Sequence, residues 1–183
     1  MEKELYFLRS SEQYLAKELL KYAVGLNETQ ENLDNYPDLK QYERDFGSFG
    51  GDVGVYMIVD NKVAGGAWVR VLANGFGFVD HQTPELVIAV KPDFQKQGIG
   101  TEIIQQLFLE VSKVFSQISL SVSENASALG FFEKLGFTKI EGSEYDNGVN
   151  GISFKMVKKL GEFKEEKEEK HLEEECFKKS FRA

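Results

Sequence analysis

The fold of this chain is decided by the stretch Glu85-Leu-Val-Ile-Ala-Val90-Lys-Pro-Asp-Phe-Gln95-Lys-Gln-Gly98-Ile-Gly100-Thr-Glu-Ile-Ile. Residues 85–90 form a short apolar run rich in β-branched side chains, which is typical of a buried strand. Pro92 and Asp93 end that strand, because proline cannot donate to a strand ladder and aspartate favours turns. From Thr101 onward a helix is predicted, because apolar residues recur there with a helical period. Its apolar stripe comprises Ile103, Ile104, Leu107, Phe108, Val111, Val114 and Phe115.

Between this strand and this helix lies a glycine-containing loop that carries the cationic Lys96. A strand, a glycine loop and a helix N-terminus in this order predict an anion site. The first N–H groups of a helix have no intrahelical acceptor, and the helix dipole favours negative charge there. Gly98 and Gly100 have no Cβ, so the backbone can approach a phosphate closely. The alternative is an ordinary connection whose glycines only make the turn, and the flanking strand and helix favour phosphate binding over it.

Two common phosphate loops do not fit this segment. A Walker loop requires Gly-Lys followed by Ser or Thr, and a dinucleotide fingerprint requires a third glycine where this chain has Ile103. The pattern that fits is Gln/Arg-x-x-Gly-x-Gly/Ala, and the residues that fill it are Gln95, Lys96, Gln97, Gly98, Ile99 and Gly100. At this point the sequence resembles the GCN5-related N-acetyltransferase (GNAT) superfamily, whose members bind the pyrophosphate of acetyl-CoA in this loop. Residues 88–100 are similar to the ribosomal-protein N-terminal acetyltransferases.

A second segment, residues 125–137, matches the family pattern Asn-x-x-Ala-x-x-Leu-Tyr-x-Lys-x-Gly-Phe. In the family, the strands numbered 85–90 and 118–123 here diverge, and pantetheine lies between them, held by unpaired backbone groups. The resemblance implies that Asn125 binds the pantetheine arm, although a helix N-cap is its alternative role. The cofactor contacts implied in this way are Ile88, Ala89, Val90, Gln95, Lys96, Gln97, Gly98, Ile99, Gly100, Thr101, Asn125 and Phe132.

The catalytic residues of the family are not all present. Phe132 replaces the tyrosine whose hydroxyl protonates the leaving sulfur in many relatives, and Leu120 stands where the ribosomal-protein branch has a glutamate base. Acyl transfer still requires a proton acceptor and a polarised carbonyl. We expect the backbone N–H of Val90 to polarise the carbonyl.

Three side chains are candidates for the proton transfer. Glu85 is the best replacement base, acting through water, with a surface glutamate as its alternative role. His81 has a suitable unperturbed pKa for a proton shuttle, but a lone loop histidine is more often without function. Tyr145 lies in the loop before the last predicted strand and can bring a hydroxyl to the acceptor.

The composition is that of an ordinary globular domain. The chain has 183 residues, 42% of them hydrophobic and 28% charged. No apolar run reaches the ~18 residues of a membrane helix, and no secretory signal is visible, so a cytoplasmic location is expected. A single Cys176 and two histidines predict neither a disulfide nor a metal site. The net charge of −8 argues against nucleic-acid binding.

The order of predicted elements is that of an α/β domain with a mixed sheet. The strands are expected at 5–9, 55–59, 63–72, 85–90, 118–122, 137–141 and 152–157. A helix capped by Ser11 should bury Tyr14, Leu15, Leu19, Leu20 and Val24 and end at Gly25. We read the cluster Gly47–Gly54 as a loop entering a hairpin, and Gly65 and Gly66 as marking a bulge or close backbone contact. The resemblance implies a GNAT-like, mostly antiparallel sheet of six to seven strands flanked by about four helices.

Residues 1–160 are expected to form the GNAT-like domain, and residues 161–183 a charged C-terminal helix. That helix packs on its own domain or forms a homodimer contact. The function implied is direct acetyl transfer from acetyl-CoA to a primary amine, on a small molecule or a peptide terminus. The alternatives are a CoA-binding module or sensor without efficient catalysis and, third, a protein-interaction domain. The acidic residues 28–45 and the loop 142–151 are expected to border the acceptor cleft, which hints at a cationic acceptor.

Overall fold

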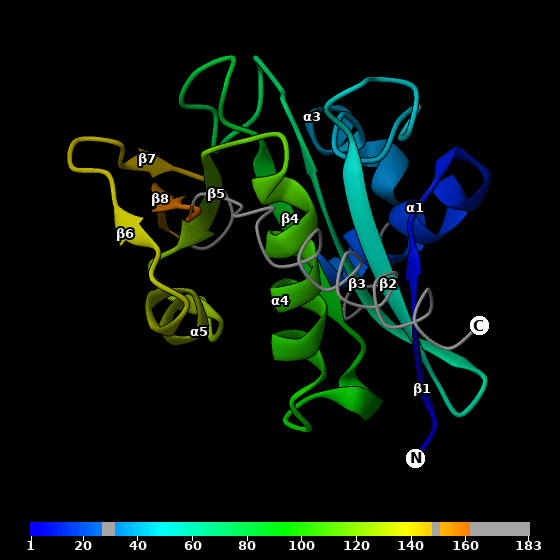
Figure 1. Cartoon of the computed structure of the whole chain (residues 1–183). Helices are drawn as coiled ribbons and strands as arrows, with labels where there is room; N and C mark the ends of the chain where they lie inside the picture. Colours follow the sequence, from blue (N-terminus) through cyan, green and yellow to red (C-terminus); the bar gives the residue numbers. More distant parts are fainter. Residues whose placement is uncertain (27–31, 148–150, 162–183) are drawn as a thin grey trace, which may run out of the picture.

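The computed structural model describes residues 1–26, 32–147 and 151–161. It contains an eight-stranded, mostly antiparallel sheet in the order β1-β2-β3-β4-β5-β8-β6, with β7 paired to β8 (Figure 1). The strands are β1 (Lys3–Phe7), β2 (Val53–Val59), β3 (Lys62–Arg70), β4 (Glu85–Val90), β5 (Gln117–Ser123), β6 (Thr138–Lys139), β7 (Tyr145–Asp146) and β8 (Ile152–Lys159). The helices are α1 (Gln13–Ala23), α3 (Pro37–Lys40), α4 (Ile99–Ser112) and α5 (Leu129–Lys134). Short 3-10 turns occur at Ser10–Glu12, Leu33–Asn35 and Pro92–Phe94.

The central strands of the sheet bury both of their faces. Alternate side chains of a strand point to opposite faces. Accordingly Leu86, Ile88 and Val90 of β4 pack into the core on the α4 side, whereas Val87 and Ala89 pack into a second core on the α1 side. Helix α4 contributes Ile103, Ile104, Leu107 and Val111, and α1 contributes Leu15, Ala16, Leu19 and Leu20. The continuous apolar run of β4 is therefore explained by burial on both sides, as the sequence predicted.

The hairpin of β2 and β3 contains the predicted irregularity. Its register shifts between Met57 and Ile58, opposite the stretch that holds Gly65 and Gly66. A Cβ on Gly65 would lie 2.5 Å from the carbonyl oxygen of Ala89, and one on Gly66 would lie 2.9 Å from Leu19. These glycines therefore allow β3 to approach both β4 and α1.

The Gly47–Gly54 loop has a structural role, in agreement with its interpretation as a hairpin entry. The carboxylate of Asp52 accepts hydrogen bonds from the amide of Gly47 at 3.0 Å and from Nε of Arg70 at 3.0 Å. Arg70 also donates to the carbonyls of Gln41 and Arg44. Both members of the Arg70–Asp52 pair are buried. This network therefore ties residues 41–44 to the sheet, next to the site described below.

Several local predictions were wrong. Tyr14 is 65% exposed and Val114 is 62% exposed, so neither belongs to an apolar stripe, and Val24 is also exposed. Ser11 lies in a 3-10 turn, and the N-cap of α1 is Glu12. The helix expected from Asn125 begins later: α5 starts at Leu129 with Ala128 as its N-cap, so Asn125 does not cap it.

The boundaries of the fold were predicted in part. The two-residue strand β7 was not predicted, because it is too short to show the alternation of apolar and polar residues that is typical of a strand. The sheet therefore has one strand more than the largest number expected. The helix predicted for residues 161–183 falls, from residue 162 onward, outside the described residues. Within the described residues, no helix combines the length and apolarity that a membrane crossing requires.

Candidate active site

The loop between β4 and α4 has the backbone shape of an anion site. Lys96 and Gly98 both have positive φ angles, 59° and 78°. Two glutamine side chains fix the loop: Nε2 of Gln95 donates to the carbonyl of Val90 at 2.9 Å, and Nε2 of Gln97 donates to the carbonyl of Asp93 at 3.0 Å. Gln95 and Gln97 thus shape the loop through their side chains.

The amides of residues 96–101 have no hydrogen-bond acceptor among the described residues. They surround the N-terminus of the 14-residue helix α4, where the helix dipole is positive. Lys96, Gly98 and Thr101 are exposed, and an added Cβ on Gly98 would meet nothing within 4 Å. Ile99 presents only its backbone, because its side chain is buried in the core. The loop therefore offers free donors and open space to a phosphate.

Strands β4 and β5 diverge beside this loop. Their pairing is limited to Glu85 opposite Ser119, and Ser119 donates to the carbonyl of Pro84 at 3.0 Å. Beyond that point, β5 continues to pair with β8, and β4 with β3. Figure 1 shows the two strands on either side of α4.

The divergence leaves backbone groups of β4 without a strand partner. Lys91 donates to the carbonyl of Ala64, so the alternation of an antiparallel ladder directs the amide of Ala89 towards β3. The amides of Ile88 and Val90 consequently face the gap. Of the three residues expected to contact pantetheine, Ile88 and Val90 have the required orientation, and Ala89 does not.

Glu85 lies at the point where the strands diverge, and its carboxyl is enclosed. Its side chain is 3% exposed. Oε1 accepts hydrogen bonds from the hydroxyl of Tyr42 at 2.6 Å and from the amide of Gly77 at 2.8 Å, while Oε2 is buried and has no partner among the described residues. A Cβ on Gly75 would lie 2.0 Å from Oε2. Burial raises the pKa of Glu85 above its ordinary value, opposed by the hydrogen bonds from Tyr42 and Gly77 and by the charge of Lys155.

A row of aromatic rings links Tyr145 to Tyr42, the hydrogen-bond partner of this carboxyl. The rings of Tyr42 and Phe76 are nearly parallel with centroids 6.5 Å apart, and those of Phe76 and Tyr145 are nearly parallel at 5.9 Å. The hydroxyl of Tyr145 hydrogen-bonds Oγ of Ser121 on β5 at 2.8 Å. Tyr145 also lines a pocket of about 590 Å³ together with Phe76, Phe78, Ile140 and Lys155. The structure thus brings Tyr145 to the edge of the strand gap.

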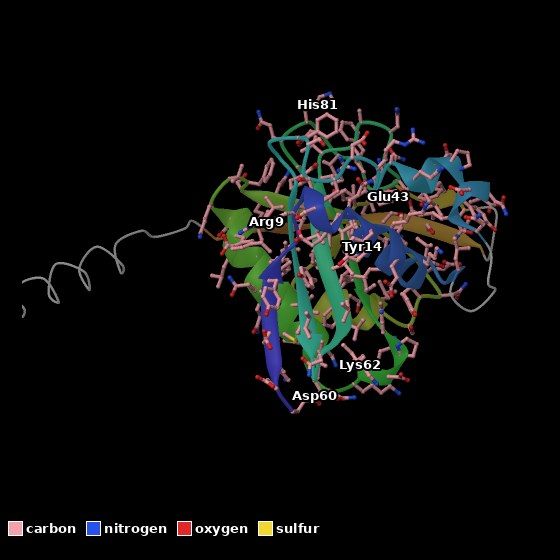
Figure 2. The ribbon with its side chains drawn as sticks, turned by 90° about the vertical axis from the view of Figure 1, so that its right-hand side faces the viewer. Arg9, Tyr14, Glu43, Asp60, Lys62 and His81 are labelled. Atoms are coloured by element: carbon pink, nitrogen blue, oxygen red, sulfur yellow. The ribbon has the colours of Figure 1, made fainter. Side chains whose placement is uncertain are left out.

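Other expected site residues lie elsewhere. His81 is exposed, with its ring against Phe78, and Figure 2 shows it at one extremity of the molecule. Phe132 is buried, and its ring packs on Phe131 and Phe137 in the core. Asn125 is exposed on the turn after β5. Leu120 is 2% exposed and belongs to the core.

Sequence reasoning missed Tyr42, Lys155 and the glycines of the 73–81 loop. Tyr42 is separated from Glu85 by 43 positions, so no local pattern links them. Lys155 sits on β8 and donates to the carbonyl of Phe78, which lies 77 positions away. The spacing of Gly75 and Gly77 around Phe76 was the one available signal, since glycines separated by a large side chain suggest a close backbone approach. Within the described ranges, no group of three potential metal ligands occurs.

Comparison with known proteins agrees with this geometry. Residues 73–160 match the family model of the acetyltransferase (GNAT) domain, and this part of the chain is therefore a GNAT acetyltransferase domain. The match contains the loop between β4 and α4, the divergent strands, Glu85 and Tyr145. A search of curated proteins found no match to the chain.

Solved structures share the fold at low sequence identity. YncA from Salmonella typhimurium, solved with its cofactor acetyl-CoA, is 21% identical with a TM-score of 0.64, covering 90% of this chain and 97% of its own. The ribosomal-protein-S18-alanine N-acetyltransferase from Escherichia coli is 18% identical with a TM-score of 0.59 and the same coverage. PaiA N-acetyltransferase from Thermoplasma acidophilum, in complex with coenzyme A, is 16% identical with a TM-score of 0.60, covering 87% of this chain and 99% of its own. At these identities the likeness concerns the fold.

Proposed function

We propose that this protein is an acetyl-CoA-dependent N-acetyltransferase that acts on a primary amine by direct transfer. The observation that carries this proposal is the set of amides at residues 96–101, which have no acceptor among the described residues and surround the N-terminus of α4. The divergence of β4 and β5 beside them supports it. The presence of acetyl-CoA in the YncA structure and of CoA in the PaiA structure gives further support.

In this proposal the chain binds the CoA moiety mainly through its backbone. The amides from Lys96 to Thr101 bind the diphosphate, with the ammonium of Lys96 nearby. The amides of Ile88 and Val90 bind the pantetheine arm and the thioester oxygen, as an added strand would be bound. Asn125 remains a candidate for the pantetheine arm. We expected Phe132 to contact the cofactor, but we now assign it a packing role, because its ring lies in the core.

The chemistry requires an acetyl thioester, which acetyl-CoA supplies. The amine nitrogen bonds to the acetyl carbon, the C–S bond breaks, sulfur leaves as a thiolate, and the nitrogen loses a proton. Glu85 is the carboxyl nearest the point of strand divergence, and we assign it the role of proton acceptor through its unpartnered Oε2. Gly75 lies against Oε2, so movement of the 73–81 loop or a water relay has to connect Oε2 with the amine. Tyr145 is the second candidate, because it lines the pocket and its hydroxyl is hydrogen-bonded to Ser121 on β5.

Two observations favour a second candidate function, a CoA-binding module without efficient catalysis. The side chain at the position of the family tyrosine, Phe132, has no hydroxyl and is buried. The carboxyl of Glu85 is also enclosed by the backbone of Gly75 and Gly77. A protein of this kind would bind acetyl-CoA tightly and release no thiol with any amine.

The tests of the proposal are calorimetry with CoA and a thiol-release assay. Calorimetry on the full chain should show CoA binding in the micromolar range, about −8 kcal/mol, and no binding at millimolar CoA would end both functions. Thiol release with a panel of amines then separates the two functions, because only the enzyme turns over. The substitutions Glu85→Gln and Tyr145→Phe should retain CoA binding. Whichever of the two substitutions removes the true proton acceptor should lower kcat by about 10²-fold or more.

The domain organisation follows the same proposal. We propose that residues 1–160 contain the whole CoA site and that residues 161–183 are not needed for it. A chain truncated after residue 160 should then bind CoA with unchanged affinity. A change from a dimeric to a monomeric mass in solution on truncation would assign the extension to a homodimer contact.

A further inference from the structure

The pocket beside the strand gap has a mainly apolar lining. Its volume is about 590 Å³, and Phe76, Phe78, Val79, Ile140 and Tyr145 line much of it. Phe76 is 37% exposed and Val79 is 36% exposed, so apolar surface faces solvent on the 73–81 loop. Exposed apolar side chains gathered in a concave region are typical of a site for an apolar ligand group.

The aromatic side chains of this lining are held in place. Phe76 lies between Tyr42 and Tyr145, with interplanar angles of 10° to each ring. Hydrogen bonds fix the outer two rings, from Tyr42 to Glu85 at 2.6 Å and between Tyr145 and Ser121 at 2.8 Å. A flat ring can therefore pack against this row without ordering a mobile side chain first, which favours aromatic ligands.

The charges on the lining suit one positive group. The pocket carries two carboxylates, Glu141 and Glu144, and one ammonium, Lys155. Glu144 is paired with Lys139, whereas Glu141 forms no hydrogen bond or ion pair among the described residues. Glu141 is near the charge of Lys139 but has no ion pair among the described residues, so it can attract one ammonium group. The ammonium of Lys155 repels any further positive charge in the pocket. This arrangement disfavours polyamines and other acceptors with several amino groups.

We infer that this pocket binds the acetyl acceptor, and that the acceptor is a singly charged primary amine on an aromatic body, of the arylalkylamine class. The inference rests on the proposed function. The aromatic body packs against Phe76 and Tyr145. Glu141 attracts the ammonium as the ligand enters, and the bound amine points to the hydroxyl pair of Tyr145 and Ser121, on the strand that borders the gap.

The test is a calorimetric titration of the full chain with 2-phenylethylamine, ethylamine and spermidine. We expect 2-phenylethylamine to bind about tenfold or more tightly than ethylamine, because a hydrophobic pocket discriminates by about this factor even for one methylene group. Spermidine should bind more weakly than 2-phenylethylamine. The variant Phe76→Ala should lose most of the preference, and Phe76→Leu, which retains apolar volume without the ring, replaces it if the alanine variant does not fold.

A matched control is Phe49→Ala, since Phe49 is 64% exposed and does not line the pocket. This variant should keep the preference for 2-phenylethylamine. Equal affinity for ethylamine and 2-phenylethylamine, or tighter binding of spermidine, would overturn the acceptor class. These titrations do not require turnover, so they stand apart from the CoA titration: failure to bind CoA overturns the proposed function, and only the amine titrations decide the acceptor class.

Discussion

The hydroxyl of Tyr42 donates a 2.6 Å hydrogen bond to Oε1 of Glu85, and the same hydroxyl accepts one from the amide of Phe76 at 2.9 Å. Tyr42 thus joins the residue at the start of β4 to the loop that covers it. Because the hydrogen bond stabilises the charged carboxylate, it lowers the pKa of Glu85 against the larger effect of burial. The chemistry proposed for Glu85 therefore depends on Tyr42 as a positioning residue.

Replacement of Tyr42 by phenylalanine should raise the pKa of Glu85 further, since the donor is lost and the burial remains. The acidic limb of the pH profile of kcat/KM should then move to higher pH, while the affinity for CoA stays unchanged. The lost buried hydrogen bond should also lower the free energy of unfolding by about 1–3 kcal/mol. Tyr14→Phe is the matched control, because Tyr14 is 65% exposed and lies on the outer surface of α1 (Figure 2). An unshifted profile in Tyr42→Phe would remove Tyr42 from the mechanism.

Glu85→Gln should change how stability depends on pH. Burial raises the pKa of Glu85 above its ordinary value of 4.5, so the folded state binds this proton more tightly than the unfolded state does. In the wild type, the protonated Glu85 contributes its full stabilisation at pH values below 4.5. This contribution is lost as the pH rises through the pKa of the folded state, and it amounts to about 1.4 kcal/mol for each unit by which the folded pKa exceeds the unfolded one. The variant lacks this titration, so its stability relative to wild type should improve over the same interval. Urea unfolding between pH 4 and 8 measures the difference, and a difference independent of pH would contradict the prediction.

Gly98→Glu should abolish CoA binding, because it places bulk and negative charge where the diphosphate is proposed to bind. Gly25→Glu is the matched control. Both glycines have a φ of 78° and nothing within 4 Å of an added Cβ, so both substitutions carry the same backbone strain of about 1–2 kcal/mol. Calorimetry should show loss of CoA binding in the first variant and wild-type affinity in the second. Retention of affinity in Gly98→Glu would exclude the loop as the phosphate site.

Gly75→Ala should destabilise the protein, because its Cβ would lie 2.0 Å from the buried Oε2 of Glu85. Overpacking of this kind costs about 1–3 kcal/mol or more. Here it meets a buried carboxyl that two hydrogen bonds hold in place. Gly50→Ala, at a position with open space and no positive φ, should be close to neutral. Thermal unfolding compares the two variants. If Gly75→Ala has wild-type stability, the 73–81 loop is not packed on Glu85 as described.

The parts of this protein that could be predicted from its sequence depend on residues that are close together along the chain. The change from the apolar run at 85–90 to the helical period from Thr101 predicted β4, the glycine-containing loop after it and α4, since strand pairing, turn formation and helix formation act over a few residues. The same local pattern supported the GNAT family, which the match to residues 73–160 confirmed. The hairpin of β2 and β3 and the irregularity near Gly65 were predicted for similar reasons.

The tertiary structure alone decided how the site is assembled. The contact of Tyr42 with Glu85 joins residues 43 positions apart, and the pocket brings the 73–81 loop against residues 140–145 and Lys155. The pairing of β4 with β3 and the point where β5 diverges decide which backbone amides of β4 remain unpaired. Neither feature can be recognised in the local sequence. The sequence by itself determined most of the helices and strands and the glycine-containing loop between β4 and α4, because the interactions that form them act between residues close together in the chain. Packing determined which side chains surround the reacting groups, because burial and long-range pairing arise only when the whole sheet has formed.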